Sequence, residues 1–283
     1  MEGTNNAVVV KDFCDFENTR NVLSDERYQD VVDMNDAYLF DSDTVLLLTV
    51  VIDCSQSVQN AGAFPTYNDF MKSVKNIIVQ NPEACANIKV CVIRYGQETE
   101  VVTRFTNMYE YEPDDQICHN MGTTDTAKAL TKAFELTEKE MYYEGKILGK
   151  KMRGGIVFHI TDGMPTSSKD EMMKAIKTYD DCVRSNGKRR IKIFSVTPDK
   201  DTADRLSYYS DHTFLTEDYY ALTDAVNAVA VLASELSSLP LQVDPLTGET
   251  DIDMMQANNN NYEVGEGVID IIPRKVMNIA DMW

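Results

Sequence analysis

The chain has 283 residues, of which 43% are hydrophobic and 26% are charged, a balance that excludes a wholly disordered protein. Its formal net charge is -19, and a field of this sign repels nucleic acid and anionic membrane surfaces, so we predict neither as a partner. The acidity is concentrated at the ends, because residues 1–43 hold 11 acids and 3 bases and residues 240–283 hold 8 acids and 2 bases. We therefore predict one domain over residues 44–239, between acidic N- and C-terminal extensions.

The N-terminal extension carries weak structural signals. Its first residues, MEGTNNAVVVKDF, lack the basic segment and apolar stretch of a secretion signal, and the chain has no run of about 18 apolar residues. We predict a cytoplasmic protein, although a secreted protein whose signal had been removed would share these features. Asn5–Val10 is interpreted as an edge strand and Asp25–Ala37 as a short acidic helix.

Strand-like and helix-like segments alternate through the central domain. Apolar, β-branched runs predict strands that are buried on both faces, at Thr44–Ile52, Ile88–Tyr95, Ile156–Thr161 and Ile191–Val196. Val101–Phe105 is predicted to pair with Ile88–Tyr95 through a short turn. Apolar residues at spacings of three and four predict amphipathic helices, at Tyr67–Gln80, Thr126–Tyr142, Lys169–Ser185 and Asp218–Ser237. This alternation predicts an α/β fold, with a doubly wound, mostly parallel central sheet flanked by helices.

The last helix is followed by Pro240, so we expect the domain to end near Leu239. In the C-terminal extension, Gly267–Ile272 is predicted to be a strand. The segment Asp244–Asp253 favours a turn over a calcium loop, because it lacks the required glutamate in register.

Cysteine and histidine offer little for metal or catalytic chemistry. The six cysteines form no CxxC pair and the chain has only three histidines, so a zinc cluster is not expected. We predict reduced, mostly buried thiols, with Cys54 packed beneath its loop rather than redox-sensitive. His159 lies within an apolar strand and is interpreted as a core residue, and the sequence leaves the role of His119 open.

Oxygen-bearing side chains follow the most apolar strand. The segment DCSQS places Asp53, Ser55 and Ser57 at alternate positions where the chain leaves the sheet, which is the edge where α/β sheets bind ligands. Such small oxygen ligands suit a hard cation such as Mg²⁺. Taken alone, Asp53 is more often a turn or helix-capping residue than a metal ligand.

Two more oxygen donors follow later strands or loops. Thr124 lies in the segment MGTTD ahead of a predicted helix, and Asp162 lies in ITDG at the end of a strand. Parallel strands joined by right-handed crossovers end at one edge of a sheet, so we expect Asp53 and Asp162 to converge although they are far apart in sequence. The joint pattern of five residues favours a metal site over the capping interpretation of Asp53 alone.

These residues resemble the metal-ion-dependent adhesion site of the von Willebrand factor A family, in which DxSxS is followed by a threonine and by an aspartate in a TDG-like turn. The resemblance covers residues 44 to about 239 and implies a Rossmann-like fold. It implies that Ser55, Ser57 and Thr124 hold Mg²⁺ directly and that Asp53 and Asp162 hold it directly or through water, with Mn²⁺ or Ca²⁺ as alternatives. Thr123 stands where many members have a glycine, which stiffens the loop without removing a ligand.

The resemblance also implies a non-enzymatic binding module. In this family a protein partner presents an Asp or Glu side chain that completes the metal's coordination, and a carboxylate there forms a charge-assisted bond to the cation. Residues 81–96 (NPEACANIKVCVIRYG) and 161–168 (TDGMPTSS) are similar to the intracellular tellurite-resistance TerY type. That similarity implies a stress-response setting beside a kinase-like or phosphatase-like partner.

Two other functions compete with this interpretation. An aspartate at the end of a strand, nearby hydroxyls and Mg²⁺ are also found together in the active sites of phosphoryl-transfer and phosphatase-like enzymes. Against it, Ser55 stands where an aspartyl-phosphate enzyme would have the second aspartate of DxD, and the chain has no GxxxxGK[ST] or GxSxG motif. Alternatively, the acidic extensions dock on a basic partner or on the chain's own domain, which is a hypothesis from charge segregation alone.

Overall fold

The computed structural model describes residues 43–182, 189–219, 221–238, 242–243, 250–251 and 270–275. The strand predicted at Asn5–Val10 and the helix predicted at Asp25–Ala37 therefore lie outside the described residues, as does most of the turn predicted at Asp244–Asp253. Any role of the acidic N-terminal extension likewise stays a prediction.

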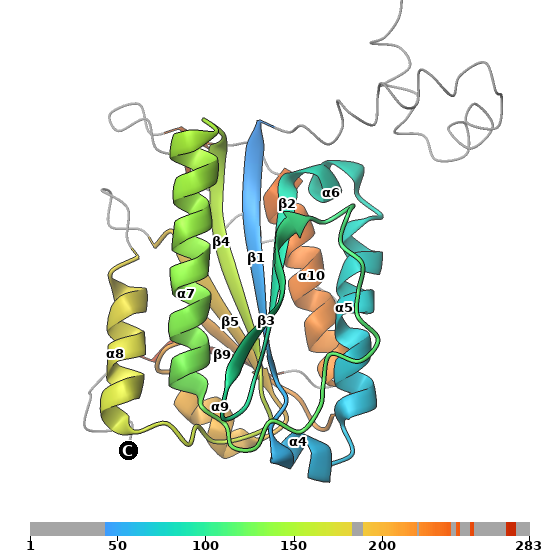
Figure 1. The fold of residues 1–283 in the computed structure, drawn as a ribbon, viewed down its shortest axis with the longest axis vertical. Coiled ribbons are helices and arrows are strands. Elements are labelled where there is room, and N and C mark those ends of the chain that lie inside the picture. The colour runs from blue at the N-terminus through green and yellow to red at the C-terminus, as the bar shows by residue number, and fades with distance from the viewer. Residues whose placement is uncertain are drawn as a thin grey trace, which may run out of the picture. The chain divides into compact units, whose positions relative to one another are not determined.

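A mixed sheet forms the centre of the described chain (Figure 1). Its strand order is β3-β2-β1-β4-β5-β6-β9, and neighbouring strands are parallel except at the edges, where β3 pairs antiparallel with β2 and β9 with β6. The strands are β1 (Thr44–Asp53), β2 (Ile88–Tyr95), β3 (Thr99–Asn107), β4 (Lys151–Ile160), β5 (Ile191–Thr197), β6 (His212–Leu215) and β9 (Asp270–Pro273). The predicted α/β fold with a mostly parallel sheet is confirmed.

Helices cover both faces of this sheet (Figure 1). One face packs against α5 (Phe64–Ile78), α6 (Pro82–Asn87) and α10 (Leu222–Ser238). The other packs against α7 (Thr126–Tyr142), α8 (Lys169–Asp180) and the end of α9 (Lys200–Leu206). The short helix α4 (Gln56–Asn60) directly follows β1. None of the described helices is long and apolar enough to cross a membrane.

The central strand β1 is apolar at successive positions because both of its faces are buried. Its side chains point alternately to opposite faces, so Leu46, Leu48, Val50 and Ile52 join the core beneath α5 and α10. The intervening residues Val45, Leu47 and Val51 join the core beneath α7 and α8. Both faces are therefore buried, as expected for a parallel strand covered by helices on each side.

The elements that the sequence analysis did not predict are short. These are α4, α6, α9, β6 and a two-stranded ladder of β7 (Gln242–Val243) and β8 (Thr250–Asp251). A π-helical turn (Tyr143–Ile147) extends α7 beyond its predicted end. Within the predicted C-terminal extension, β9 overlaps the strand expected at Gly267–Ile272 and pairs with β6.

Candidate metal centre

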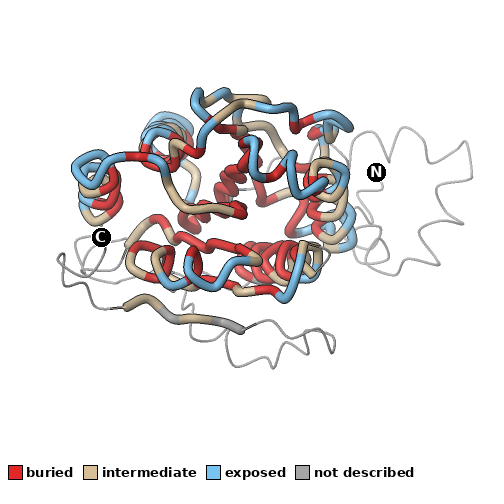
Figure 2. Tube along the Cα trace, turned by 90° about the horizontal axis from the view of Figure 1, so that it is seen from below, coloured by how far each residue is buried: buried red, intermediate tan, exposed pale blue. Residues whose placement is uncertain are grey.

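The carboxyl ends of β1 and β4 meet at one edge of the sheet. These strands are parallel neighbours with Ile52 opposite Ile160, so the loops that follow them begin side by side. Figure 2 looks at the molecule from this end, where the buried strands finish between the two layers of helices. The topology therefore places the segments that contain Asp53 and Asp162 next to each other, as the sequence analysis expects.

Asp53 is the last residue of β1 and its side chain is fully buried, with 0% of the residue exposed. One carboxylate oxygen, Oδ1, accepts a hydrogen bond of 2.9 Å from the backbone N–H of Ser55. The other, Oδ2, accepts one of 2.7 Å from the hydroxyl of Thr161. Both oxygens are thus held in fixed positions by the two loops that meet at this edge.

Hydrogen bonds also link the side chains of Ser55, Ser57 and Asp162. The hydroxyl oxygens of Ser55 and Ser57 lie 2.9 Å apart, and the Ser57 hydroxyl donates to Oδ1 of Asp162 at 2.8 Å. The second oxygen of Asp162, Oδ2, accepts a hydrogen bond of 2.9 Å from the phenol of Tyr219. Four of the five predicted site residues therefore belong to two adjoining hydrogen-bonded groups.

Thr124 reaches the same edge through its backbone. The loop before it is bound to the first segment, because Gln56 N–H donates to the carbonyl of Gly122 at 2.8 Å. The carbonyl of Thr124 accepts from Thr166 N–H at 2.8 Å, which ties it to the loop after Asp162. Thr124 is buried, and among the interactions of the described residues no hydrogen bond joins its hydroxyl to the other four side chains.

Gly96 allows the Thr124 loop to approach the end of β2. A Cβ atom at Gly96 would lie 2.5 Å from both the Cβ and the carbonyl oxygen of Met121, which is closer than real Cβ contacts. The carbonyl of Gly96 also accepts from Asp125 N–H at 2.9 Å, directly after Thr124. Glycine at this position is therefore required for the close packing of the loop that carries Thr124.

The site contains two buried carboxyl groups, Asp53 and Asp162, and no basic side chain is paired with them among the described residues. Burial, with the nearby charge of Asp162, raises the pKa of Asp53 from 3.8 to about 7. Burial also raises the pKa of Asp162, and the charge of Asp199 adds to that effect. No Lys, Arg or His in the described part of the chain forms an ion pair with either carboxylate. A buried pair of acids without a basic partner fits a site that receives a cation.

Tyr219 and Thr161 are functional candidates that the sequence analysis missed. Thr161 holds Asp53, and Tyr219 holds Asp162 from the loop that precedes α10. Nothing in the local sequence indicates that Tyr219 contacts Asp162, because the two residues are 57 positions apart. The sequence does carry a signal for Thr161, since it directly precedes Asp162 and follows β4, the strand next to β1.

The remaining candidates from the sequence lie in the core or at the surface. His159 is fully buried, its Nε2 lies 2.7 Å from the Tyr95 hydroxyl, and burial lowers its pKa to about 3, so it is a neutral core residue. His119 is exposed. The five described cysteines are free and buried, and the thiols of Cys54 and Cys118 lie 3.2 Å apart beneath the first loop.

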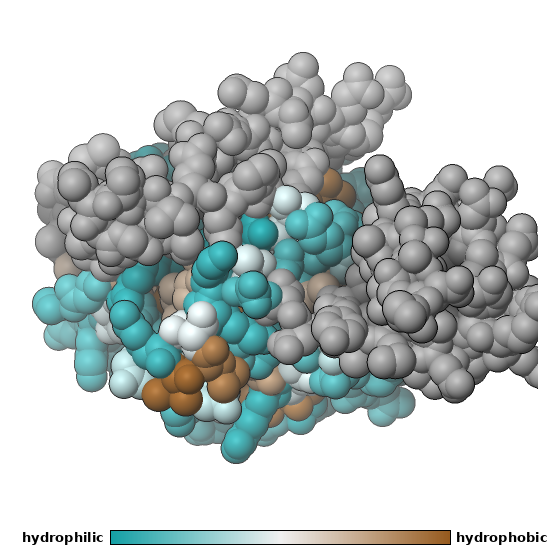
Figure 3. Space-filling view, turned by 90° about the horizontal axis from the view of Figure 1, so that it is seen from above, coloured by the Kyte–Doolittle hydropathy of each residue, from teal (hydrophilic) through white to brown (hydrophobic). Residues whose placement is uncertain are grey.

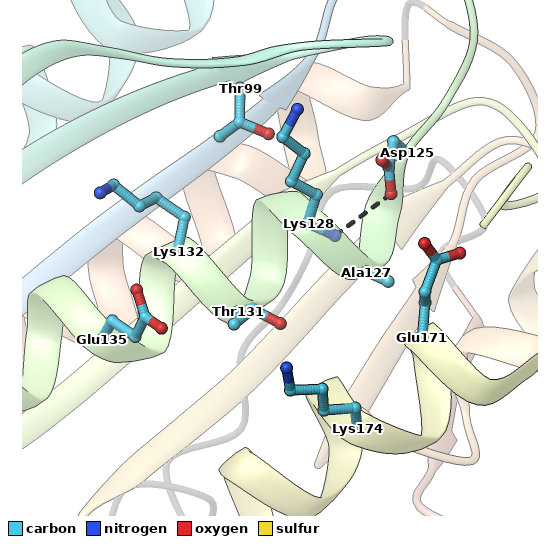
Figure 4. A pocket seen from close by; sticks show the side chains of 9 residues that line it. All are labelled: Thr99, Asp125, Ala127, Lys128, Thr131, Lys132, Glu135, Glu171 and Lys174. Carbon is cyan, nitrogen blue, oxygen red and sulfur yellow. Dashed lines mark hydrogen bonds between the residues drawn. The ribbon is translucent and has the colours of Figure 1, made fainter. Parts of the chain in front are cut away.

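A surface pocket of about 430 Å³ adjoins this edge. Figure 4 shows that it lies between α7 and α8, with Lys128, Lys132 and Lys174 on its walls. Asp125, which directly follows Thr124, stands at its end, where it caps α7 by accepting from Lys128 N–H and also accepts from Ser167. The pocket is thus next to the candidate metal centre and not part of it.

Comparison with known proteins agrees with this architecture. Residues 48–165 match the family model described as the von Willebrand factor type A domain. Among solved structures, a von Willebrand factor type A protein from Catenulispora acidiphila superimposes with a TM-score of 0.51 at 11% identity, over 71% of this chain and 44% of that one. Residues 48–165 are therefore similar to the von Willebrand factor type A domain, and the solved structure shows the same α/β fold.

Two further solved structures are similar to the chain, with lower TM-scores. The D319A mutant of the PilB minor pilin from Streptococcus sanguinis gives a TM-score of 0.47 at 10% identity, over 71% of this chain and 64% of that one. The pilus adhesin SpaC from Lactobacillus rhamnosus GG gives 0.49 at 14% identity, over 69% and 30%. The chain thus spans less than two-thirds of each structure's length. No curated protein matches the chain.

Proposed function

We propose that this protein is a metal-dependent binding module in which one divalent cation, with Mg²⁺ preferred, captures an acidic side chain of a protein partner. The observation that carries the proposal is the pair of buried carboxylates, Asp53 and Asp162, whose pKa values are raised and which have no basic partner among the described residues. Three hydroxyl-bearing residues lie at the same sheet edge. Hydroxyl and carboxylate oxygens are the ligands that Mg²⁺ prefers.

Each residue has a distinct part in this proposal. Ser55, Ser57 and Thr124 would supply hydroxyl oxygens directly, and Asp53 and Asp162 would hold the cation directly or through water. The two carboxylates balance the formal charge of the divalent ion and the three hydroxyls are neutral, so one position of the octahedral shell remains for a further oxygen ligand. An Asp or Glu side chain of the partner would fill the remaining position, so the metal acts as a bridge between the two proteins.

The hydrogen bonds around Asp53 favour binding over catalysis. An aspartate that attacks phosphorus needs a free, accessible oxygen, whereas Asp53 is 0% exposed and both of its oxygens accept hydrogen bonds. This arrangement suits a residue that holds other groups in place. These contacts count against Asp53 as a nucleophile in the phosphoryl-transfer alternative. A kinase-like or phosphatase-like partner, a stress-response setting and a cytoplasmic location remain parts of the proposal that rest on sequence resemblance.

Calorimetric titration of the full chain with MgCl₂ and MnCl₂ tests the metal site. We expect one cation per chain, and we expect Asp53→Ala and Thr124→Ala to abolish that binding while the circular dichroism spectrum stays native. Tyr219→Phe should weaken binding by about tenfold, because partners that orient metal ligands typically contribute that much. Tyr208→Phe is the matched control, since Tyr208 contacts Lys275 and not the site.

A second titration tests the bridging role. N-acetyl-glutamate amide, as a minimal acidic side chain, should bind the Mg²⁺-loaded chain weakly and the chelator-treated chain not at all. The neutral glutamine analogue should bind neither. Equal binding of the glutamate probe with and without metal would remove the bridging role, and metal-dependent hydrolysis of an aryl phosphate that Asp53→Ala abolishes would replace it with the enzyme alternative.

A further inference from the structure

Large apolar side chains are exposed where α7 ends. Tyr142, Tyr143, Ile147 and Leu148 are 63%, 46%, 60% and 49% exposed, and of the five large hydrophobic residues exposed in the described chain only Val79 lies elsewhere. Tyr142 is the last residue of α7, Tyr143 and Ile147 lie in the π-helical turn that follows it, and Leu148 directly follows that turn. We call residues 142–148 the apolar turn. Exposed apolar side chains that gather in one place indicate a contact surface rather than chance.

The exposed charges within residues 139–151 are positive, and one exposed acid, Asp43, lies beside them, where its carbonyl accepts from Lys151 N–H at 2.7 Å. Lys139, Lys146 and Lys151 are exposed, and none of them forms an ion pair with a described carboxylate. The two acids of residues 139–151, Glu140 and Glu144, are turned inward, where both bind Lys89. The side chain of Glu144 is 0% exposed and that of Glu140 is 21% exposed. This surface is therefore apolar and basic in a protein whose net charge is negative.

The turn is held in place by its own buried contacts. The Lys89 ammonium contacts Glu144 at 2.5 Å, and Lys150 contacts the same carboxylate at 3.5 Å. The backbone is closed by hydrogen bonds from Leu148 N–H to the Tyr143 carbonyl at 3.0 Å and from Lys150 N–H to the Glu144 carbonyl at 2.9 Å. The apolar side chains therefore stand on a fixed base, and π-helical turns of this kind are frequent at functional sites.

The apolar turn and the candidate metal centre lie at opposite ends of the sheet. The turn directly precedes β4, whereas Asp162 follows the last residue of that ten-residue strand. Figure 3 looks at the end of the molecule away from the metal edge and shows an apolar patch bordered by hydrophilic atoms. A ligand on the apolar turn would therefore leave the metal edge free.

We propose that the apolar turn is a docking surface for an anionic lipid bilayer. Tyrosine prefers the boundary between lipid and water, aliphatic side chains enter the acyl region, and lysines beside them contact anionic headgroups. The net charge of the chain led the sequence analysis to predict no membrane partner, but at physiological ionic strength charges beyond about 8 Å are largely screened. The lysines nearest the bilayer then decide the sign of the interaction.

Co-sedimentation of the full chain with vesicles tests this proposal. The vesicles are made of phosphatidylcholine alone or of phosphatidylcholine and phosphatidylserine at about three to one, and EDTA is present so that no cation bridges the metal centre to lipid. We expect binding to the anionic vesicles only. Ile147→Ser with Leu148→Ser, and separately Lys146→Glu with Lys151→Glu, should each lower the fraction bound by about tenfold.

Matched variants control for general effects of charge and hydrophobicity. Lys128→Glu with Lys132→Glu makes the same charge change on exposed lysines nearer the other end of α7, and Val79→Ser removes the exposed hydrophobic residue at the end of α5, on the other face of the sheet. Both should bind vesicles like the parent chain. The proposal fails if the parent chain does not bind anionic vesicles at physiological ionic strength, or if the turn variants bind as well as the controls. It also fails if sedimentation without lipid shows a dimer that Ile147→Ser with Leu148→Ser abolishes, because the turn would then be an interface between copies.

Discussion

Asp53 shows how a single position combines a structural cost with a proposed function. Its carboxyl group lies at the end of the most buried strand and accepts hydrogen bonds from Ser55 and Thr161, yet burial still raises its pKa to about 7. Between about pH 4 and pH 7, the Asp53 carboxyl is therefore protonated to a larger extent in the native state than in the unfolded chain. A bound cation would reverse that preference, because it stabilises the carboxylate.

The pH dependence of stability follows from this shift. In the metal-free protein, Asp53 keeps its proton up to about pH 7 in the native state but loses it near 3.8 when unfolded, so its contribution to the free energy of unfolding falls as pH rises through that window. At about 1.4 kcal/mol per pKa unit, the full difference is on the order of 4 kcal/mol. Asp53→Asn should remove this decline, which urea titrations in EDTA between about pH 4 and pH 8 would measure.

The comparison of the two chains isolates Asp53 from other titrating groups. His159, with its pKa lowered to about 3, adds stability as pH rises through the same window, but it does so equally in the parent and the variant. Asp115→Asn, at an exposed aspartate, is the control and should keep the parent's profile. If the parent and Asp53→Asn lose stability in parallel, the shifted pKa of Asp53 is refuted.

At the scale of the elements, packing between loops decides where Thr124 lies. The loop that carries Thr124 approaches β2 only because Gly96 has no side chain, and the backbone of Gly155 in β4 gives α7 the same kind of room. A Cβ atom at Gly155 would lie 2.7 Å from Cγ2 of Thr137. Both glycines thus allow close packing, but Gly96 packs against the loop that carries Thr124, whereas Gly155 packs against α7.

These glycines provide a matched pair of substitutions. Gly96→Ala and Gly155→Ala should each lower the free energy of unfolding by about 1–3 kcal/mol, because each inserts a methyl group into occupied space. Only Gly96→Ala should also weaken Mg²⁺ binding, since it displaces the loop of Thr124. Thermal melts and calorimetric titrations of both variants measure the two effects. Equal metal affinity in both variants would show that the position of this loop does not matter for the site.

The elements also show how far the sequence predicts this fold. The strands β1, β2 and β5 and the helix α7 are predicted within a few residues, because long apolar or amphipathic runs specify both a period and a degree of burial. The short elements α4, α6, α9 and β6 are missed, since four to seven residues carry no readable period and are held by tertiary contacts. The start of β4 is missed because Gly154 and Gly155 interrupt its apolar pattern.

At the scale of the whole molecule, the parallel topology brings distant segments to one edge. The sequence predicts that Asp53 and Asp162 converge because both follow strands of one parallel sheet, and β1 and β4 are indeed neighbours. It does not predict Tyr219, which reaches Asp162 from a loop that follows the short strand β6. Nor does it predict the apolar turn, because the exposure of Ile147 and Leu148 depends on how α7 ends.

The most direct test of the metal centre is a crystal of the full chain soaked in MnCl₂ and measured near the manganese absorption edge. We predict one anomalous peak at the carboxyl ends of β1 and β4, bonded to the hydroxyls of Ser55, Ser57 and Thr124, with Asp53 and Asp162 bonded directly or through one water. A saturating soak that leaves these five residues without a peak would contradict the account, as would a peak there that the Thr124 hydroxyl does not contact.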